Sequence, residues 1–154
     1  MKRRTFLKRS TLAVTTAVVP ALAQQPTKFQ PVQDVKPLLA EITKGAAVDQ
    51  GGIEVQLPQI AENGNSVPMH IKVDHSMAPA DFVAAIHIVA ERNPRPLVAS
   101  FHLKPEAGRA EISTRVRLAG TQTVRVLAAM SDGRFRIVQQ DVLVTAAACL
   151  DESM

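Results

Sequence analysis

The sequence predicts an all-β protein: an immunoglobulin-like antiparallel β-sandwich of about seven strands with one short N-terminal helix. Three observations predict this fold. Apolar and polar residues alternate in several short segments, turn residues such as Asn-Gly, Asn-Pro and Asp-Gly separate those segments, and only one early stretch has helical spacing. Short alternating strands at such intervals are typical of two packed antiparallel sheets.

The N-terminal segment has the three parts of an export signal. It contains "RRTFLK", which fits the twin-arginine pattern, then a moderately apolar stretch over roughly residues 11–19, then a small-x-small cleavage signal ending at Ala23. A membrane anchor is the alternative, but the apolar stretch is short and contains threonines. We therefore expect residues 1–23 to be a cleaved twin-arginine signal peptide and the mature protein to lie in the periplasm, without a membrane anchor.

The positive charge of the chain comes from this segment. Of the 18 Lys and Arg residues, five lie in residues 1–23, and none of the 14 Asp and Glu residues does. Cleavage leaves 13 basic and 14 acidic residues, a net charge of −1. The high isoelectric point is therefore no evidence for nucleic-acid binding, which requires a basic patch on the folded domain.

A linker and one helix precede the strands. Residues 24–33 are polar and contain proline, so we interpret them as a linker, followed by a single domain over 34–145. Asp34 is the predicted N-cap, Pro37 falls in the first turn, and Gly45 ends the helix after Lys44. The apolar face of this helix consists of Val35, Leu38, Leu39 and Ile42.

The predicted strands are, in order, 53–57, 67–73, 84–90, 97–103, 110–118, 122–130 and 134–144. The clearest alternation is in 110–118, which is typical of a half-buried strand. The segments 84–90 and 122–130 are apolar on nearly both faces, so the outer face of their sheet needs a cover. The N-terminal helix or another chain would provide it, and the sequence leaves both possibilities open.

The histidines give no clear metal site. His70, His87 and His102 each lie in a predicted strand and His75 follows one, but they have no recognised ligand spacing. His70 and His102 are in the polar phase of their strands and are expected to face solvent. We predict no metal and no cofactor.

No other motif predicts catalysis. Asp151 and Glu152 are adjacent but lie on a tail, and there is no glycine-rich phosphate loop, G-x-S-x-G motif or recognisable Ser/His/Asp set. Arg115 and Arg117, to which Arg125 is a possible addition, form either a basic face for an anion or an acidic partner, or the solvated face of a strand. We predict that the protein is not an enzyme.

Cys149 is the only cysteine and lies in the predicted C-terminal arm, residues 146–154. An exported protein with one cysteine has no internal disulfide, so the thiol bonds to a partner, is reactive, or is buried as a small apolar group. A position close to the end of the sequence favours an accessible thiol. The neighbouring Asp151 and Glu152 disfavour the thiolate, so such a thiol suits activation by another protein.

Two segments resemble the SoxY family, the sulfur-carrier subunits of the periplasmic thiosulfate-oxidising Sox system. They are "LPQIAENGNSVPMHIKVDHSM" and "ERNPRPLVASFHLKPEAGRAEISTRVRLAGTQTVRVLAAMSDG". The most specific matches are "LP.IAENG..VP", "NP.P.VA.F" and "TR.RLA.TQ.V". The likeness covers roughly residues 34–149.

This resemblance implies a function. The fold would be an immunoglobulin-like sandwich that pairs with a SoxZ-like subunit. Cys149 would hold thiosulfate-derived sulfur covalently on a swinging arm. It would present that sulfur to a c-type cytochrome, a hydrolase and a sulfane dehydrogenase.

The arm differs from the family pattern. The family cysteine lies in Gly-Gly-Cys-Gly-Gly, whereas this chain has Ala147-Ala148-Cys149-Leu150-Asp151. Glycines make an arm slim and conformationally free, and these residues do not. The alternative function is therefore a non-catalytic structural or binding subunit, whose cysteine is incidental or forms a disulfide dimer.

Overall fold

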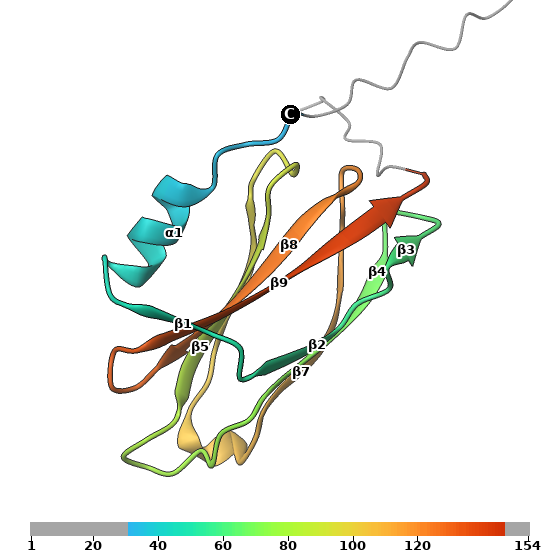
Figure 1. The fold of residues 1–154 in the computed structure, drawn as a ribbon. Coiled ribbons are helices and arrows are strands. Elements are labelled where there is room, and N and C mark those ends of the chain that lie inside the picture. Colours follow the sequence, from blue (N-terminus) through green and yellow to red (C-terminus); the bar gives the residue numbers. More distant parts are fainter. Residues whose placement is uncertain (1–30, 147–154) are drawn as a thin grey trace, which may run out of the picture.

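The computed structural model describes residues 31–146, which form two packed β-sheets with a helix on the outer face of the larger one (Figure 1). The predicted fold class is confirmed. The larger sheet has the order β1-β9-β8-β5-β6, with β3 also pairing with β9, and the smaller sheet has the order β2-β4-β7. The elements are α1 Lys36–Thr43, β1 Val48–Gln50, β2 Ile53–Gln56, β3 Ile60–Ala61, β4 Val67–Val73, β5 Val83–Ala90, β6 Leu97–His102, η1 Pro105–Ala107, β7 Ala110–Val116, β8 Gln122–Met130 and β9 Phe135–Val144.

All seven predicted strands are present, with ends that differ by at most two residues. They pair with one another in antiparallel fashion. The sequence reasoning missed β1 and β3, both of which pair parallel to β9. At three and two residues they are too short to show an alternation, and their pairing with a distant strand is a tertiary effect.

The core lies between the two sheets and is built mainly from the apolar phase of the longer strands. Its largest fully buried side chains include Ile71, Ile86, Ile88 and Leu118. In β4 the alternation predicted from the sequence appears directly as burial, because every second residue from Val67 to Val73 is buried. The sheets are thus held together by apolar packing.

Helix α1 covers the outer face of the larger sheet. Val35 packs against Val89 of β5 and Leu127 of β8, and all three are buried. The rest of the contact is made by half-buried Leu38, Leu39, Ile42 and Ile137. This explains why β5 and β8 are apolar on nearly both faces: the helix provides cover for the second face at this end of the sheet (Figure 1).

The helix ends differ slightly from the prediction. The N-cap position is Val35 and not Asp34, although the Asp34 carboxylate accepts a hydrogen bond of 3.0 Å from the Lys36 N–H. The last helical residue is Thr43, because Lys44 already has a left-handed φ of 52° and Gly45 follows with 75°. Among the described residues, no helix has the length and apolar character that crossing a bilayer requires.

Candidate functional site

The predicted arm begins at the end of β9, and its root is firmly attached. Cys149, Asp151 and Glu152 lie outside the described residues, but Thr145 and Ala146 belong to the described part. Thr145 N–H donates to the Ala61 carbonyl at 3.0 Å, and the Ala146 carbonyl accepts from Gly64 N–H at 2.8 Å. The Thr145 hydroxyl also donates to the Glu62 carbonyl, at 3.2 Å. The segment 61–64 therefore fixes the point from which the arm leaves the domain.

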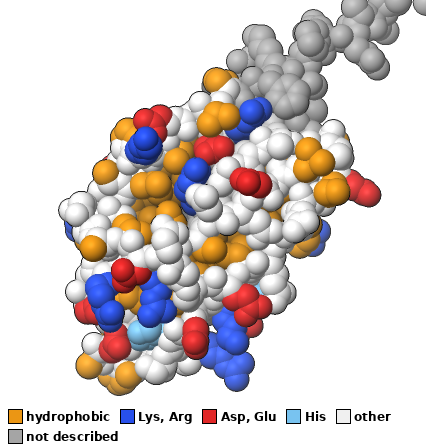
Figure 2. Space-filling view, in the orientation of Figure 1, with side chains coloured by type: hydrophobic (Ala, Val, Ile, Leu, Met, Phe, Trp, Pro, Cys, Tyr) orange, Lys and Arg blue, Asp and Glu red, His pale blue; other side chains and the backbone are white. Residues whose placement is uncertain are grey.

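Two apolar side chains flank this root. Ile60 of β3 and Leu143 of β9 are paired neighbours, and their exposed fractions are 60% and 49%. Figure 2 shows surface hydrophobic side chains on the side where β3 and the end of β9 lie. Single exposed leucines and isoleucines are common on protein surfaces, but an adjacent pair beside the start of the predicted arm is a candidate contact site.

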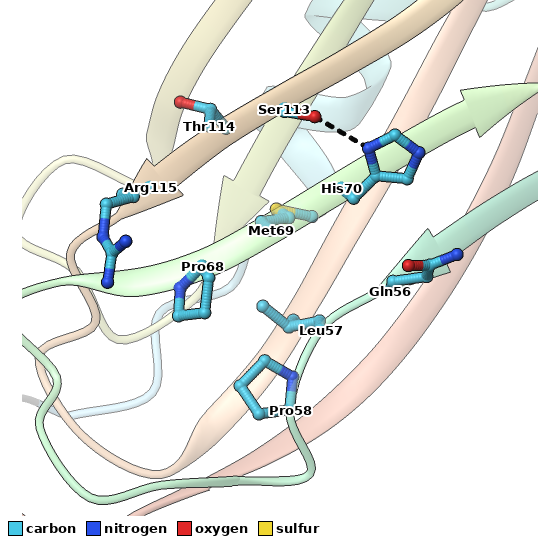
Figure 3. Close-up of a pocket in the computed structure, with 9 residues that line it drawn as sticks. All are labelled: Gln56, Leu57, Pro58, Pro68, Met69, His70, Ser113, Thr114 and Arg115. Atoms are coloured by element: carbon cyan, nitrogen blue, oxygen red, sulfur yellow. Dashed lines mark hydrogen bonds between the residues drawn. The ribbon is translucent and has the colours of Figure 1, made fainter.

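A hollow of about 740 Å³ lies on the outer side of the smaller sheet. It forms because β2 pairs with β4 only as far as Gln56 and His70, after which Leu57 and Pro58 turn away toward β3. Figure 3 shows the hollow between this segment and the start of β4, with Arg115 at one side. The walls are Gln56, Leu57, Pro58, Pro68, Met69, His70, Ser113, Thr114 and Arg115.

A hydrogen-bonded histidine lies at the rim of this hollow. His70 Nδ1 is 2.9 Å from the Ser113 hydroxyl (Figure 3). On its other side, His70 Nε2 is 3.2 Å from a carboxylate oxygen of Glu111. The sequence analysis found no Ser, His and acid set, because only the strand register brings these residues together. His70 lies opposite Ser113, and Glu111, two residues before Ser113 in β7, lies opposite Lys72, the next outward residue of β4.

This arrangement suits sheet pairing better than catalysis. With the proton on Nε2, His70 donates to Glu111 and accepts from Ser113, which is the bonding order of a nucleophile, base and acid. However, the three side chains lie on an open face of the sheet, where water and salt screen their interactions. We interpret them as cross-strand bonds. His70 is half-buried, so the prediction that it faces solvent holds only in part.

The other histidines lie elsewhere. His87 is 2.8 Å from the Ser100 hydroxyl, and its ring lies edge-on to His102, with 6.3 Å between centroids. Burial lowers the pKa of His87, and the nearby His102 lowers it further. His102 is exposed as predicted, and His75 pairs with Asp81 at 3.3 Å. Within residues 31–146, no three His, Cys, Asp or Glu side chains form a group that would hold a metal ion.

The predicted basic face is divided between the two sheets. Arg115 and Arg117 are exposed at the end of β7, where Arg115 donates to the Ser66 hydroxyl at 2.7 Å. Arg125 lies on β8 of the other sheet and forms an ion pair with Glu91, at 2.7 Å. Grouping Arg125 with the other two was therefore wrong: its charge is already neutralised inside the larger sheet.

Comparison with known proteins points to one family. A family model described as the sulfur oxidation protein SoxY matches residues 39–149. The structure of the sulfur carrier protein SoxY from Chlorobium limicola f. thiosulfatophilum is similar, with 28% identity and a TM-score of 0.60. The match covers 72% of this chain and 96% of that one. Comparison with curated protein sequences gave no match.

A second group shares the fold alone. The superoxide reductase (neelaredoxin) from Ignicoccus hospitalis has a TM-score of 0.55 at 10% identity, covering 61% of this chain and 80% of its own. At that identity the likeness concerns the architecture and says nothing about chemistry.

Proposed function

The chain belongs to the SoxY family of sulfur oxidation proteins, and from this premise we propose that it carries sulfur covalently on the thiol of Cys149. One observation carries the proposal. The family match extends past β9 and ends at Cys149 itself, so the likeness includes this cysteine as well as the sandwich, which supports Cys149 as the attachment point. In this proposal the sandwich is a rigid body, and the residues that start at Ala146 present the thiol to other proteins.

In the chemistry that the family implies, other proteins accept the electrons and catalyse each step. In the loading step the Cys149 thiol loses its proton and forms an S–S bond with the outer sulfur of thiosulfate. Two electrons leave, and a c-type cytochrome accepts them. A hydrolase then adds water across the bond to the sulfonate group, which releases sulfate and leaves sulfane sulfur on Cys149. A sulfane dehydrogenase oxidises this sulfur further. In this scheme the carrier supplies only the thiol, so we propose a carrier and not an enzyme.

The proposal includes a partner subunit and a compartment. A SoxZ-like subunit forms a heterodimer with the sandwich. Export follows the twin-arginine route, with cleavage after about Ala23, so the folded protein reaches the periplasm. Transport of a folded chain would allow the partner subunit to be carried out with it.

The arm is the part where this chain departs from its family. Ala147 and Ala148 replace glycines before the thiol, and Leu150 and Asp151 replace those after it. These side chains make the arm bulkier, so the active sites that receive it need wider entrances than a glycine arm requires. We infer that this carrier serves partner enzymes adapted to its own arm.

The intact mass of the mature protein from cells grown on thiosulfate tests the function. We expect an adduct of thiosulfate or sulfane sulfur that reductant removes, and that is missing in a Cys149→Ser variant. A thiol that stays unmodified, or is found only in a Cys149-linked dimer, would favour the structural-subunit alternative. The same mass locates the cleavage site, since removal of residues 1–23 is expected.

A further inference from the structure

Cys149 follows the sandwich domain by only a few residues, so a protein that binds this thiol must also come close to the domain. Within residues 31–146, the last residue held by a hydrogen bond is Ala146, whose carbonyl accepts from Gly64 N–H. Three residues lead from Ala146 to Cys149, and even a fully extended chain spans only about 10 Å over that length. An enzyme that acts on the thiol therefore brings its entrance within roughly 10 Å of the arm root, and its surface meets the residues around that root.

The surface at that root has the composition of a small docking contact. Its centre is apolar, formed by Ile60 and Leu143 side by side across the β3–β9 pairing. Two exposed polar residues flank it: Glu62, which directly follows β3, and Asp141 of β9, two residues before Leu143. An apolar centre inside a polar rim is the usual anatomy of a protein interface.

We propose that the Ile60–Leu143 pair is the contact on which the enzymes that process Cys149 dock, by way of an apolar rim beside their active-site entrances. This inference rests on the proposed carrier function, because it assumes that the arm enters those active sites. The limited reach of the arm and its direct continuity with β9 argue for these enzymes as the occupant.

The small size of the pair agrees with that role. A carrier that serves several enzymes in turn leaves each one after reaction, which requires a small and short-lived interface. A pair of side chains contributes enough to orient the encounter without holding the complex together. A permanent subunit would instead require a much larger contact.

The test compares enzyme-dependent loading of matched variants. Periplasmic extract from a strain that lacks this gene supplies the enzymes, thiosulfate is the substrate, and the purified mature carrier is added at a series of concentrations. The initial rate of adduct formation on Cys149 is read by intact mass. The variants are Ile60→Gln and Leu143→Gln, which add no charge near the arm. The matched control is Leu97→Gln, because Leu97 is an exposed leucine (39%) on the opposite edge strand β6.

We expect the carrier concentration that gives half-maximal loading to rise roughly tenfold for Ile60→Gln and Leu143→Gln, and less than twofold for the control. The maximal rate and the reaction of Cys149 with a small aromatic disulfide reagent stay unchanged, since the thiol itself is untouched. Equal curves for all four proteins, with the unmodified carrier well loaded, overturn the docking contact and leave the carrier function intact. A carrier that never acquires the adduct ends both proposals.

Two other occupants are distinguished in the same samples. If Leu143→Gln converts a dimer to a monomer in sedimentation, with loading unchanged, the pair is a contact between two copies of this chain. If the variant loses a co-purifying second subunit, the pair belongs to the permanent heterodimer interface. Either result overturns the proposal that processing enzymes dock there.

Discussion

Gly64 donates its backbone N–H to the carbonyl oxygen of Ala146 at 2.8 Å, and its own carbonyl accepts from Leu118 N–H at the same distance. These two bonds tie the turn after β3 to the end of β9 and to the segment after β7. The arm root is thus part of the rigid sandwich. Whatever freedom the thiol has must come from the few residues that follow.

Deletion of Ala147 and Ala148 tests the importance of that short tether. It reduces the maximal Cα–Cα distance between Ala146 and Cys149 from about 10 Å to about 3.8 Å. We expect enzyme-dependent sulfur loading to fall more than tenfold, because the thiol no longer reaches a recessed active site. Reaction with a small thiol reagent should persist. Replacement of both residues by glycine keeps the length and serves as the control; equal loss in both variants would contradict the role of reach.

Asn93 joins three segments, and its replacement should destabilise the domain. Its side-chain amide donates to the Arg117 carbonyl at 2.7 Å, and its side-chain oxygen accepts from Ala119 N–H at 3.0 Å and from Gln122 at 3.2 Å. The residue is 9% exposed, so Asn93→Ala leaves buried polar groups without partners. We expect a loss of about 2–4 kcal/mol in the free energy of unfolding, measured in urea.

The conservative change Asn93→Asp separates the two sides of this network. It keeps the acceptor for Ala119 but brings a carboxylate against the Arg117 carbonyl, where the amide donated. We expect it to be destabilising as well, because the repulsion replaces a short hydrogen bond. An aspartate variant as stable as the native protein would show that the bond to Arg117 contributes little.

Helix α1 covers the larger sheet, and a substitution at Leu127 tests how much this contact stabilises the protein. Its side chain is fully buried beneath the helix, so Leu127→Ala removes apolar contacts on the side where Val35 packs. We expect a loss of about 2–4 kcal/mol in stability. The matched change Leu143→Ala, at a half-exposed position, should alter stability by less than about 0.5 kcal/mol. Similar losses for both leucines would mean that the helix contact stabilises little.

The strands were predictable because the core uses a period of two. In β4 and β7 the polar phase faces water, and the sequence shows this directly. The short strand β3 was missed because Ile60 and Ala61 are ordered by the end of β9, far away in sequence. The contacts among His70, Ser113 and Glu111 depend on strand register, which alternation does not specify. Arg125 was misplaced for the same reason: its partner Glu91 is visible only once β5 and β8 are paired.

The arm is the opposite case, because its key residue was identified from the sequence and its surroundings were not. The proposed role of Cys149 rests on its being the only cysteine and on the family match that ends there. The apolar pair at the root did not follow from the sequence, since Ile60 and Leu143 are separated by most of the domain. Their adjacency required the parallel pairing of β3 with β9.

The half-buried His87 predicts a specific pH dependence of stability. Burial lowers its pKa below the ordinary value of 6.5, and the neighbouring His102 adds to that effect. As the pH falls below about 6.5, the unfolded chain therefore binds the proton before the folded protein does. The contribution of neutral His87 to stability is complete above that pH. It declines as the pH falls from the unfolded pKa to the folded one.

Unfolding in urea at about pH 7.5 and about pH 5.5 measures this decline, and His87→Gln removes the titrating group while keeping a side chain that can bond to Ser100. We expect the native protein to lose more stability between the two conditions than the variant does. The difference reports on His87 and its interaction with His102, because the other histidines are present in both proteins. If the two proteins show the same dependence on pH, then the His87 ring is protonated as easily in the folded state as in the unfolded chain. That result would mean that its partial burial between β5 and β6 does not lower its pKa.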